Sequence, residues 1–282
     1  SDNEALTLNY DLRLALKTSF TGEDMLTTVL RAGNFASSIF GTGLTFMETA
    51  YQGGNGAGSV NIGRLFYTFP VGDDLTVTAG PVVRTDDPGM YAGYATFYPA
   101  DLMLDFFTYG GAWSTNQLGG TGTGLGAVYT IGDSGFSVSG NYVARNGDDD
   151  DGGIGTDESN YTSSWQLFYS GELFEGSFLA QAGYAVNRGV GYTMAVQAND
   201  VTDSDNYSLA AAWKPADSGL MPSISTGWSK TDAQADAADF SAWYVGLEWS
   251  DAFFAGNSLG TAIGVSPNSP TAGDTSTLWE LF

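Results

Sequence analysis

The sequence of 282 residues contains no cysteine and no histidine. Without histidine there is no Ser-His-Asp triad, no histidine general base and no imidazole metal ligand. Without cysteine there is no thiolate nucleophile, no zinc or iron–sulfur site built on sulfur and no disulfide. We therefore expect a protein that is not an enzyme and that needs no cofactor.

Basic residues are also scarce, since 9 Lys and Arg stand against 32 Asp and Glu and give a formal charge of −23. Nucleic acid is excluded as a partner because its binding requires clustered cations. Charged residues make up 15% of the chain, whereas about 25% is typical of soluble domains. No apolar run approaches the roughly 20 residues of a membrane-spanning helix. The opening residues lack the basic and apolar regions of a signal peptide, so we expect a mature or trimmed chain.

Apolar and polar residues alternate along most of the chain, which is the period of β-strands. The alternation is clearest at 6–17, 75–80, 136–142 and 207–213, and weaker at 125–131, 161–169, 178–186, 220–228, 241–249 and 259–265. From residue 133 onward, short Gly- and Asp-rich connections alternate with long acidic ones such as 146–160. This pattern predicts one domain over 1–282, a β-meander with a turn side and a loop side.

The second face of these strands distinguishes a membrane barrel from a soluble sandwich. It carries mostly Ser, Thr, Gly and Asn instead of Lys, Glu and Arg, and acidic residues gather in the connections. A transmembrane antiparallel β-barrel has a lipid-facing apolar surface, a polar lumen and loops in water. Aromatic residues near the short turns fit an interfacial girdle: Phe20, Phe69, Phe136, Phe174, Trp213, Phe253 and Phe254. At about 10 residues per strand we expect 14–16 strands, with 16 the best estimate, short periplasmic turns and long acidic extracellular loops.

An alternative reading stays open at this point. The aromatic residues could instead plug the core of a secreted acidic β-sandwich that acts as an adhesin or sugar-binding module. Alternation by itself does not separate the two architectures, because a soluble sheet also places apolar residues on one face.

Three segments resemble the cyanobacterial outer-membrane porins. Residues 19–26 (SFTGEDML) with 30–35 (LRAGNF) are similar to the opening of that family, 64–74 (RLFYTFPVGDD) to a second block, and 278–282 (LWELF) to a third near its C-terminal region. The resemblance runs through nearly the whole chain. It covers the barrel portion, without the surface-layer-homology domain of family members.

This resemblance implies a homotrimeric barrel in the outer membrane of a Gram-negative-type bacterium, in contact with outer-membrane lipid. Members of the family pass small solutes, notably inorganic ions, and many are described as porins for carbohydrate transport. The resemblance therefore implies passive ion transport and diffusion of small hydrophilic solutes through a water-filled lumen. Family members also tend to continue through further strands beyond the block that matches 278–282, so the last strands are expected to lie outside this sequence.

The few cations are the candidate selectivity residues. A charge facing lipid near the bilayer midplane costs about 2–4 kcal/mol, so we expect them to face the lumen, where a ring of cations would bias ion passage. The alternative is that each cation only pairs with a luminal carboxylate such as Asp11. The candidate set is Arg13, Lys17, Arg31, Arg64, Arg84 and Arg145, with Asp11 as a partner.

One stretch interrupts the strand rhythm, and we expect an inward constriction segment within 85–120. A short helix is predicted from 99–101 through Asp105. If the segment folds inward, Asp101 and Asp105 oppose the arginines and create a field across the pore. The alternative is an external loop that packs against a neighbouring subunit.

The long loop contains a weak match to a calcium-binding loop. Asp149, Asp151 and Glu158 fit ligand positions three, five and twelve, but Gly147 at position one supplies no side-chain ligand. A solvated acidic loop without metal is the expectation.

Overall fold

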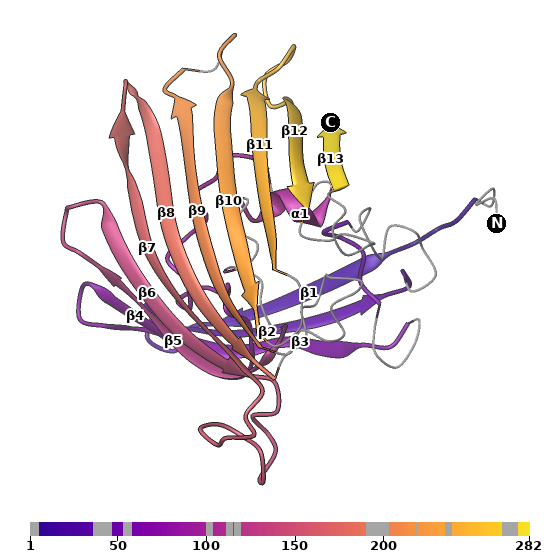
Figure 1. Cartoon of the computed structure of the whole chain (residues 1–282), viewed down its shortest axis with the longest axis vertical. Coiled ribbons are helices and arrows are strands. Elements are labelled where there is room, and N and C mark those ends of the chain that lie inside the picture. The colour runs from indigo at the N-terminus through magenta and orange to yellow at the C-terminus, as the bar shows by residue number, and fades with distance from the viewer. Residues whose placement is uncertain are drawn as a thin grey trace.

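The computed structural model describes residues 6–35, 47–52, 58–99, 104–110, 115, 120–189, 203–217, 219–234, 239–266 and 276–282. Its strands form one antiparallel sheet in which each strand pairs with the next along the chain (Figure 1). The strands are β1 (Asp11–Thr18), β2 (Met25–Gly33), β3 (Asn61–Val71), β4 (Leu75–Val83), β5 (Gly122–Thr130), β6 (Phe136–Ala144), β7 (Tyr161–Leu173), β8 (Gly176–Arg188), β9 (Ser204–Pro215), β10 (Ser223–Ala233), β11 (Phe240–Ser250), β12 (Ser258–Ser266) and β13 (Ser276–Leu281).

The expected all-β antiparallel meander is confirmed, and the described residues account for 13 strands. Among these residues no pairing joins β1 to β13, so a closed barrel of 14–16 strands stays a prediction. A single continuous sheet differs from the two packed sheets of a sandwich. Every described strand has a neighbour of adjacent number, which is the connectivity of an up-and-down sheet.

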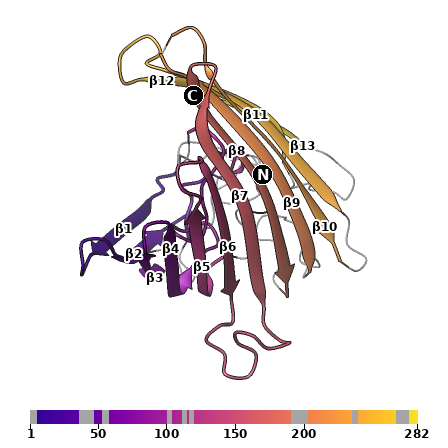
Figure 2. The same ribbon diagram turned by 90° about the vertical axis from the view of Figure 1, so that its left-hand side faces the viewer.

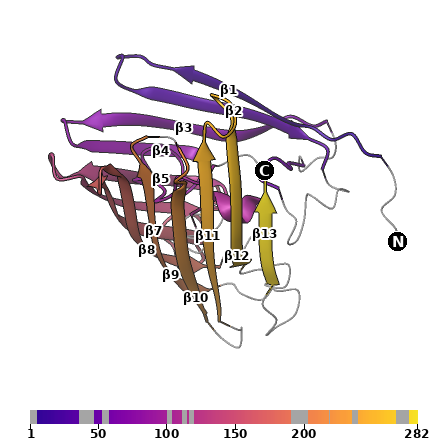
Figure 3. The ribbon, with the colours of Figure 1, turned by 90° about the horizontal axis from the view of Figure 1, so that it is seen from above.

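The sheet is strongly curved, and its first and last strands lie on either side of its concave face. Strands β1–β3 form one wall and β10–β13 the other, with α1 (Asp105–Thr108) between them (Figures 2 and 3). Strand direction rotates steadily from β1 to β13, as the right-handed twist of β-sheets requires. The molecule therefore has a concave inner face and a convex outer face.

The two faces differ in chemistry as the alternation predicts. On β9, Tyr207 and Leu209 are exposed on the convex face, while Asn206 and Ser208, which alternate with them, are buried on the concave face. On β10, Trp228 is 40% exposed and its neighbour Ser229 only 2%. Apolar residues thus face outward and small polar residues inward, the reverse of a soluble protein.

The short connections lie at one end of the sheet, and the long ones at the other. The first short turn is organised by Asp24, whose Oδ1 accepts hydrogen bonds from Ser19 Oγ and from the Phe20 and Thr21 N–H groups, each at 2.8 Å. The Tyr67 hydroxyl donates to Oδ2. These donors, Tyr67 first, hold the pKa of the Asp24 carboxyl well below its usual value. The turn therefore depends on an ionised carboxylate.

The aromatic residues expected near the short turns do lie at this end, on the convex face or in the turns. Phe20, Phe174 and Phe253 are 69%, 84% and 86% exposed. On the adjoining strands, Phe136 contacts Tyr169 with ring centroids 4.8 Å apart, and Trp213 Nε1 donates to the Leu173 carbonyl at 2.7 Å. An exposed aromatic belt at one end of the sheet is the arrangement expected at a membrane interface.

The helix differs from the prediction. It is a single turn, Asp105–Thr108, and begins where the predicted helix from 99–101 was expected to end. Leu104 is held in an extended conformation because it bridges to Met47 and its N–H donates to Glu280 Oε2 at 3.0 Å. Within the described residues, helical geometry starts after Leu104, and residues 100–103 of the expected helix lie outside them. No helix within the described part of the chain is long and apolar enough to cross a membrane.

Candidate functional site: a segment on the concave face

The chain leaves the sheet after Val83 and crosses the concave face, and we call the described residues 84–99 and 104–110 the inner segment. Its first turn is closed by Asp87, whose Oδ2 accepts the Arg84 N–H at 2.7 Å and whose carbonyl accepts the Met90 N–H at 2.9 Å. Pro88 and Gly89, with Gly89 at φ +76°, redirect the chain away from a strand. Side chains on β6, β7, β8, β10, β11 and β13 bond the described residues of the segment.

Inward-facing side chains on these strands bond the main chain of the inner segment. Asn141 Nδ2 on β6 donates to the carbonyls of Thr85 and Met90 at 2.9 and 3.0 Å. Gln166 on β7 donates to the Gly93 carbonyl at 2.7 Å and accepts the Ala92 N–H at 3.2 Å. Gln181 Oε1 on β8 accepts the Ala95 N–H at 3.0 Å. Each carboxamide supplies groups that a main chain away from its own sheet requires.

The same pattern continues over the C-terminal strands. Ser225 Oγ on β10 accepts the Phe97 N–H at 2.8 Å. Tyr244 on β11 shares a hydrogen bond of 2.8 Å with Thr96. Glu280 on β13 accepts the Tyr98 hydroxyl at 2.7 Å through Oε1 and the Leu104 N–H through Oε2.

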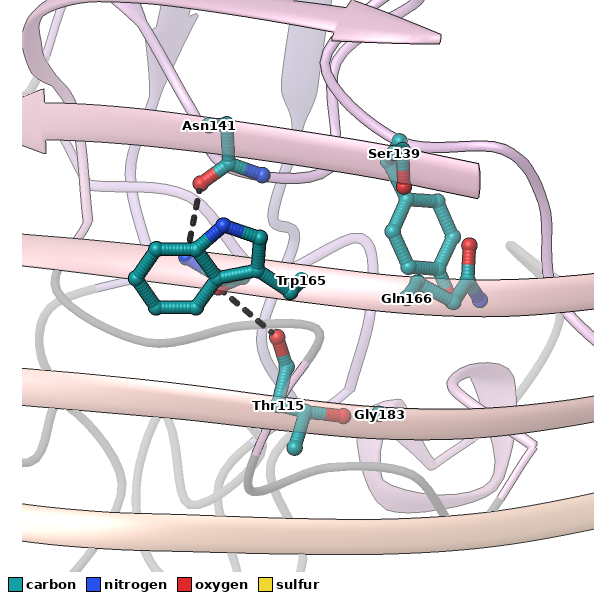
Figure 4. A pocket seen from close by; sticks show the side chains of 8 residues that line it. Thr115, Ser139, Asn141, Trp165, Gln166 and Gly183 are labelled. Carbon is teal, nitrogen blue, oxygen red and sulfur yellow. Dashed lines mark hydrogen bonds between the residues drawn. The ribbon is translucent and has the colours of Figure 1, made fainter. Parts of the chain in front are cut away.

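Thr115 lies on the concave face as well. Its carbonyl accepts the Ser164 hydroxyl at 3.3 Å, and its own hydroxyl is 2.5 Å from Ser208 Oγ. Figure 4 shows Asn141 and Thr115 bonded to the same strand from its two sides. Thr115 thus lies against β7 and β9.

Two hydrophobic clusters pack the inner segment against the sheet. Met90 lies with Phe66, Val83 and Val143 near its start. Near its end, Phe106 and Phe107 lie with Tyr98, Tyr244 and Ala262, and all are at most 4% exposed. The concave face is therefore polar along the middle of the inner segment and apolar at its two ends.

Inward-facing glycines provide room for this packing. A Cβ at Gly126 would lie 2.8 Å from Met90 Sδ, and one at Gly246 would lie 2.6 Å from the Tyr98 ring. Both distances are too short for non-bonded atoms, so a larger residue would displace the inner segment. Close backbone approach accounts for part of the high glycine content, 39 residues.

Three of the candidate arginines lie on the N-terminal wall, Arg13, Arg31 and Arg64, and together with Arg84 at the start of the inner segment we call them the arginine cluster. Arg13 and Arg31 are directly opposite each other on β1 and β2, a repulsive placement for like charges. Asp11 offsets the repulsion, because its carboxylate lies 2.9 Å from Arg31 Nε and 3.5 Å from Arg13 Nη2. Arg31 also lies over the Tyr51 ring at 4.4 Å.

The other two arginines pair with acids of the inner segment. Arg64 Nε donates to Asp87 Oδ1 at 2.8 Å, and Arg84 Nε donates to Asp86 Oδ1 at 2.7 Å. Burial raises the pKa of the Asp86 carboxyl, but Arg84 outweighs burial and holds it below its usual value. Pairing with carboxylates, one of the two expectations for these arginines, is what the described residues display.

Asp105 is 1% exposed and lies beside a second carboxyl group. Burial raises its pKa well above the usual value, and a hydrogen bond with Glu48 raises it further. Glu48 in turn accepts Arg13 Nη2 through its carbonyl at 2.9 Å. A chain of contacts thus runs from Arg13 of the arginine cluster through Glu48 to Asp105 of the inner segment.

The remaining candidate residues lie elsewhere. Lys17 is exposed at the turn end of β1, on the same face as Arg13, and Arg145 is exposed at the loop end after β6. Asp101 lies outside the described residues. In the loop after β6, Asp149, Asp150 and Asp151 have carboxylates within 4.8 Å of one another, and Glu158 is not in that group. Asp149 Oδ1 accepts the Asp151 and Gly152 N–H groups, which is the local bonding of a solvated loop.

Several residues of the site were not identified from the sequence, above all Asn141, Gln166, Gln181 and Glu280. Their only sequence signal is a polar residue on the inward phase of a strand. Their partners are 51 to 182 residues away along the chain. Pairings over such distances do not follow from local periodicity.

The comparisons with known proteins agree with this geometry. No protein-family model matches the chain. An uncharacterized protein of the cyanobacterium Synechocystis is 26% identical over 92% of this chain, which spans about half (52%) of that relative's length. Among solved structures, OprB of Pseudomonas putida matches 93% of this chain and 70% of its own, with a TM-score of 0.62 and 14% identity.

Two further solved structures have the same architecture. A mutant of the Rh. blastica porin matches 97% of this chain and 78% of its own, with a TM-score of 0.50 and 13% identity. An engineered protein described for asymmetric conductivity matches 99% of this chain and 83% of its own, with a TM-score of 0.53 and 12% identity. The chain therefore has the fold of the outer-membrane porins and a cyanobacterial relative, as its resemblance to the cyanobacterial porins indicated.

Proposed function

We propose that this protein is an outer-membrane porin that lets small hydrophilic solutes and inorganic ions diffuse passively through a water-filled lumen. The observation that carries the proposal is the distribution of side chains over the curved sheet. Leu209 and Trp228 are 57% and 40% exposed on the convex face, whereas Ser208 and Ser229 beside them are 2% exposed on the concave face. Only a protein surrounded by lipid gains from this arrangement.

The proposal includes closure of the sheet into a barrel, assembly as a homotrimer and location in the outer membrane of a cyanobacterium. It assigns no enzymatic activity and no cofactor, in keeping with a chain that has no histidine or cysteine. The exposed aromatic belt at the turn end supports insertion of the sheet into a bilayer up to this level.

Selectivity is assigned to the arginine cluster and the acids opposite it. Arg13, Arg31 and Arg64 line one wall, and Asp86, Asp87 and Asp105 belong to the inner segment. Opposed charges of this kind create a field across a pore without a strong binding site. Because Arg31, Arg64 and Arg84 are each paired with a carboxylate, we expect a modest ion preference and no high-affinity solute site. Lys17 and Arg145 extend the set toward the two mouths.

Planar-bilayer recordings test this function. The purified protein, refolded in detergent, is expected to add discrete conductance steps in potassium chloride and to migrate faster in gels before heating than after it. Loss of the mobility shift would contradict the barrel. A normal mobility shift without any conductance would leave the architecture in place and overturn the channel function.

A further inference from the structure

We propose that a row of uncharged inward side chains, together with Glu280, holds the inner segment against the wall and thereby sets the size limit of the pore. The row comprises Asn141, Gln166, Gln181, Ser225 and Tyr244, and we call these residues with Glu280 the docking row. This inference deepens the proposed function and rests on it. The residues act through the inner segment, so they are positioning residues.

Hydrogen bonds to the inner segment are spread over most of the strands that it spans. The sheet has eight strands in order from β6 to β13, and on six of them, β6, β7, β8, β10, β11 and β13, a member of the docking row binds the segment within 3.5 Å. Asn141, Gln166, Gln181 and Ser225 each bond a peptide group of the segment. The main chain of the inner segment is thus bonded at intervals along its length. These bonds hold the segment to one path, because any shift breaks several of them together.

The sheet itself is shaped for this path. Gly126 and Gly246 leave room on the sheet for Met90 and Tyr98 of the segment. Gln166 is 6% exposed and Gln181 5%, so both carboxamides are enclosed between sheet and segment. A buried carboxamide that loses its partner is costly, which favours the docked position over any partly released one.

The position of the inner segment determines how much of the proposed lumen stays open. Asp86, Asp87 and Asp105 are carried on the same segment, so its release would move the acidic side of the proposed field as well. The docking row therefore influences both the width of the pore and the distribution of charge in it, although its side chains other than Glu280 are uncharged. We infer that its loss enlarges the pore more than it changes ion preference.

Release of the segment can be measured with one introduced thiol, because the native chain has no cysteine. Ala95 lies within the inner segment and is 0% exposed, so in the Ala95→Cys protein a bulky water-soluble maleimide should react only when the segment leaves the wall. Adding Gln166→Leu or Ser225→Ala is expected to raise the labelling rate about fivefold or more, the change in equilibrium that follows from losing one typical hydrogen bond.

Pore size is measured in parallel with neutral polyethylene glycols of graded length. Gln166→Leu and Ser225→Ala are expected to admit longer polymers than the native protein does. Ser137→Ala is the matched control, because Ser137 also lies on the inward phase of β6 and has no described bond to the segment. It should change neither the labelling rate nor the size limit. The mobility shift on heating verifies that each variant is folded, and Ser225→Ala removes only one hydroxyl.

Three results would overturn the inference. The first is labelling of Ala95→Cys as fast as that of Asp148→Cys, which places the thiol in an exposed loop. The second is an unchanged labelling rate in both docking-row variants, and the third is an unchanged polymer size limit despite faster labelling. Absence of conductance in the native protein would overturn the proposed function instead, while the labelling rates would still decide whether the row holds the segment.

Discussion

At the scale of single residues, the concave face separates charge from attachment. Arginines and acids gather on the N-terminal wall, where Asp11 lies between Arg13 and Arg31. Carboxamides and hydroxyls hold the inner segment over the other strands. Asp11 is central to this wall, because its buried carboxylate, 3% exposed, pairs with two arginines that face each other.

Asp11→Asn is expected to shift the reversal potential in a salt gradient toward anions. The substitution leaves the two facing arginines without their shared carboxylate, so net positive charge rises on the wall. The lost charged hydrogen bonds should also cost about 1–3 kcal/mol of stability, seen as a lower midpoint of heat unfolding in detergent.

Arg31→Gln should move the reversal potential in the opposite direction. Asp133→Asn, in the exposed turn after β5, removes one negative charge as Asp11→Asn does and serves as the control for that variant. An identical reversal potential in all four proteins would remove the arginine cluster from the selectivity assignment.

At the scale of elements, the turns use residues that local preference does not favour. The two-residue connection between β7 and β8 is Phe174-Glu175, with φ of +50° and +57°. Both central residues of such a turn require positive φ, which Asn and Gly adopt most readily. Phe174 nevertheless places an aromatic ring at the turn end, where it is 84% exposed. The turn thus accepts backbone strain in exchange for an apolar side chain at the expected membrane interface.

Glu175→Gly is expected to stabilise the protein by about 1 kcal/mol, because glycine adopts positive φ without the steric cost of a Cβ. The measurement is the midpoint of heat unfolding in detergent. Glu172→Gly, the same substitution three residues earlier within β7, should lower the midpoint instead, since glycine weakens a strand interior. Equal effects at both positions would contradict the role of the turn geometry.

At the scale of the whole molecule, the solvent on each side of the sheet is the governing condition. Neighbouring residues of one strand face opposite environments if the sheet is a barrel wall. On β1, Leu14 points to the convex face with 51% exposure, and Ala15 lies on the face of Arg13 and Lys17. This pair tests the membrane orientation independently of conductance.

Leu14→Lys is expected to hinder folding into lipid vesicles, because a cation facing lipid costs about 2–4 kcal/mol near the midplane. Ala15→Lys adds the same side chain to the luminal face and should fold nearly as well as the native protein. The measurement is the fraction of protein that shows the heat-dependent mobility shift after refolding into vesicles. If both variants fold equally well, the convex face does not contact lipid.

The sequence alone determined the class of protein and the orientation of its strands. Alternation over residues such as 207–213 assigns each side chain to a face, because the period of two is local to the strand. The absence of histidine and cysteine excluded the kinds of catalytic and metal site that depend on these side chains. The arginines could be placed on the inward phase, although their carboxylate partners other than Asp11 could not.

Only the tertiary structure decided the path of the inner segment and the residues that hold it. Asn141 and Gln166 are ordinary polar residues in the sequence, and their importance comes from main-chain groups 51 to 74 residues away. The start of α1 was likewise set by Glu280, which is 176 residues from Leu104. These hydrogen bonds join segments that meet only after the sheet curves. They leave no periodic signal in the sequence, so only the folded structure identifies the residues that make them.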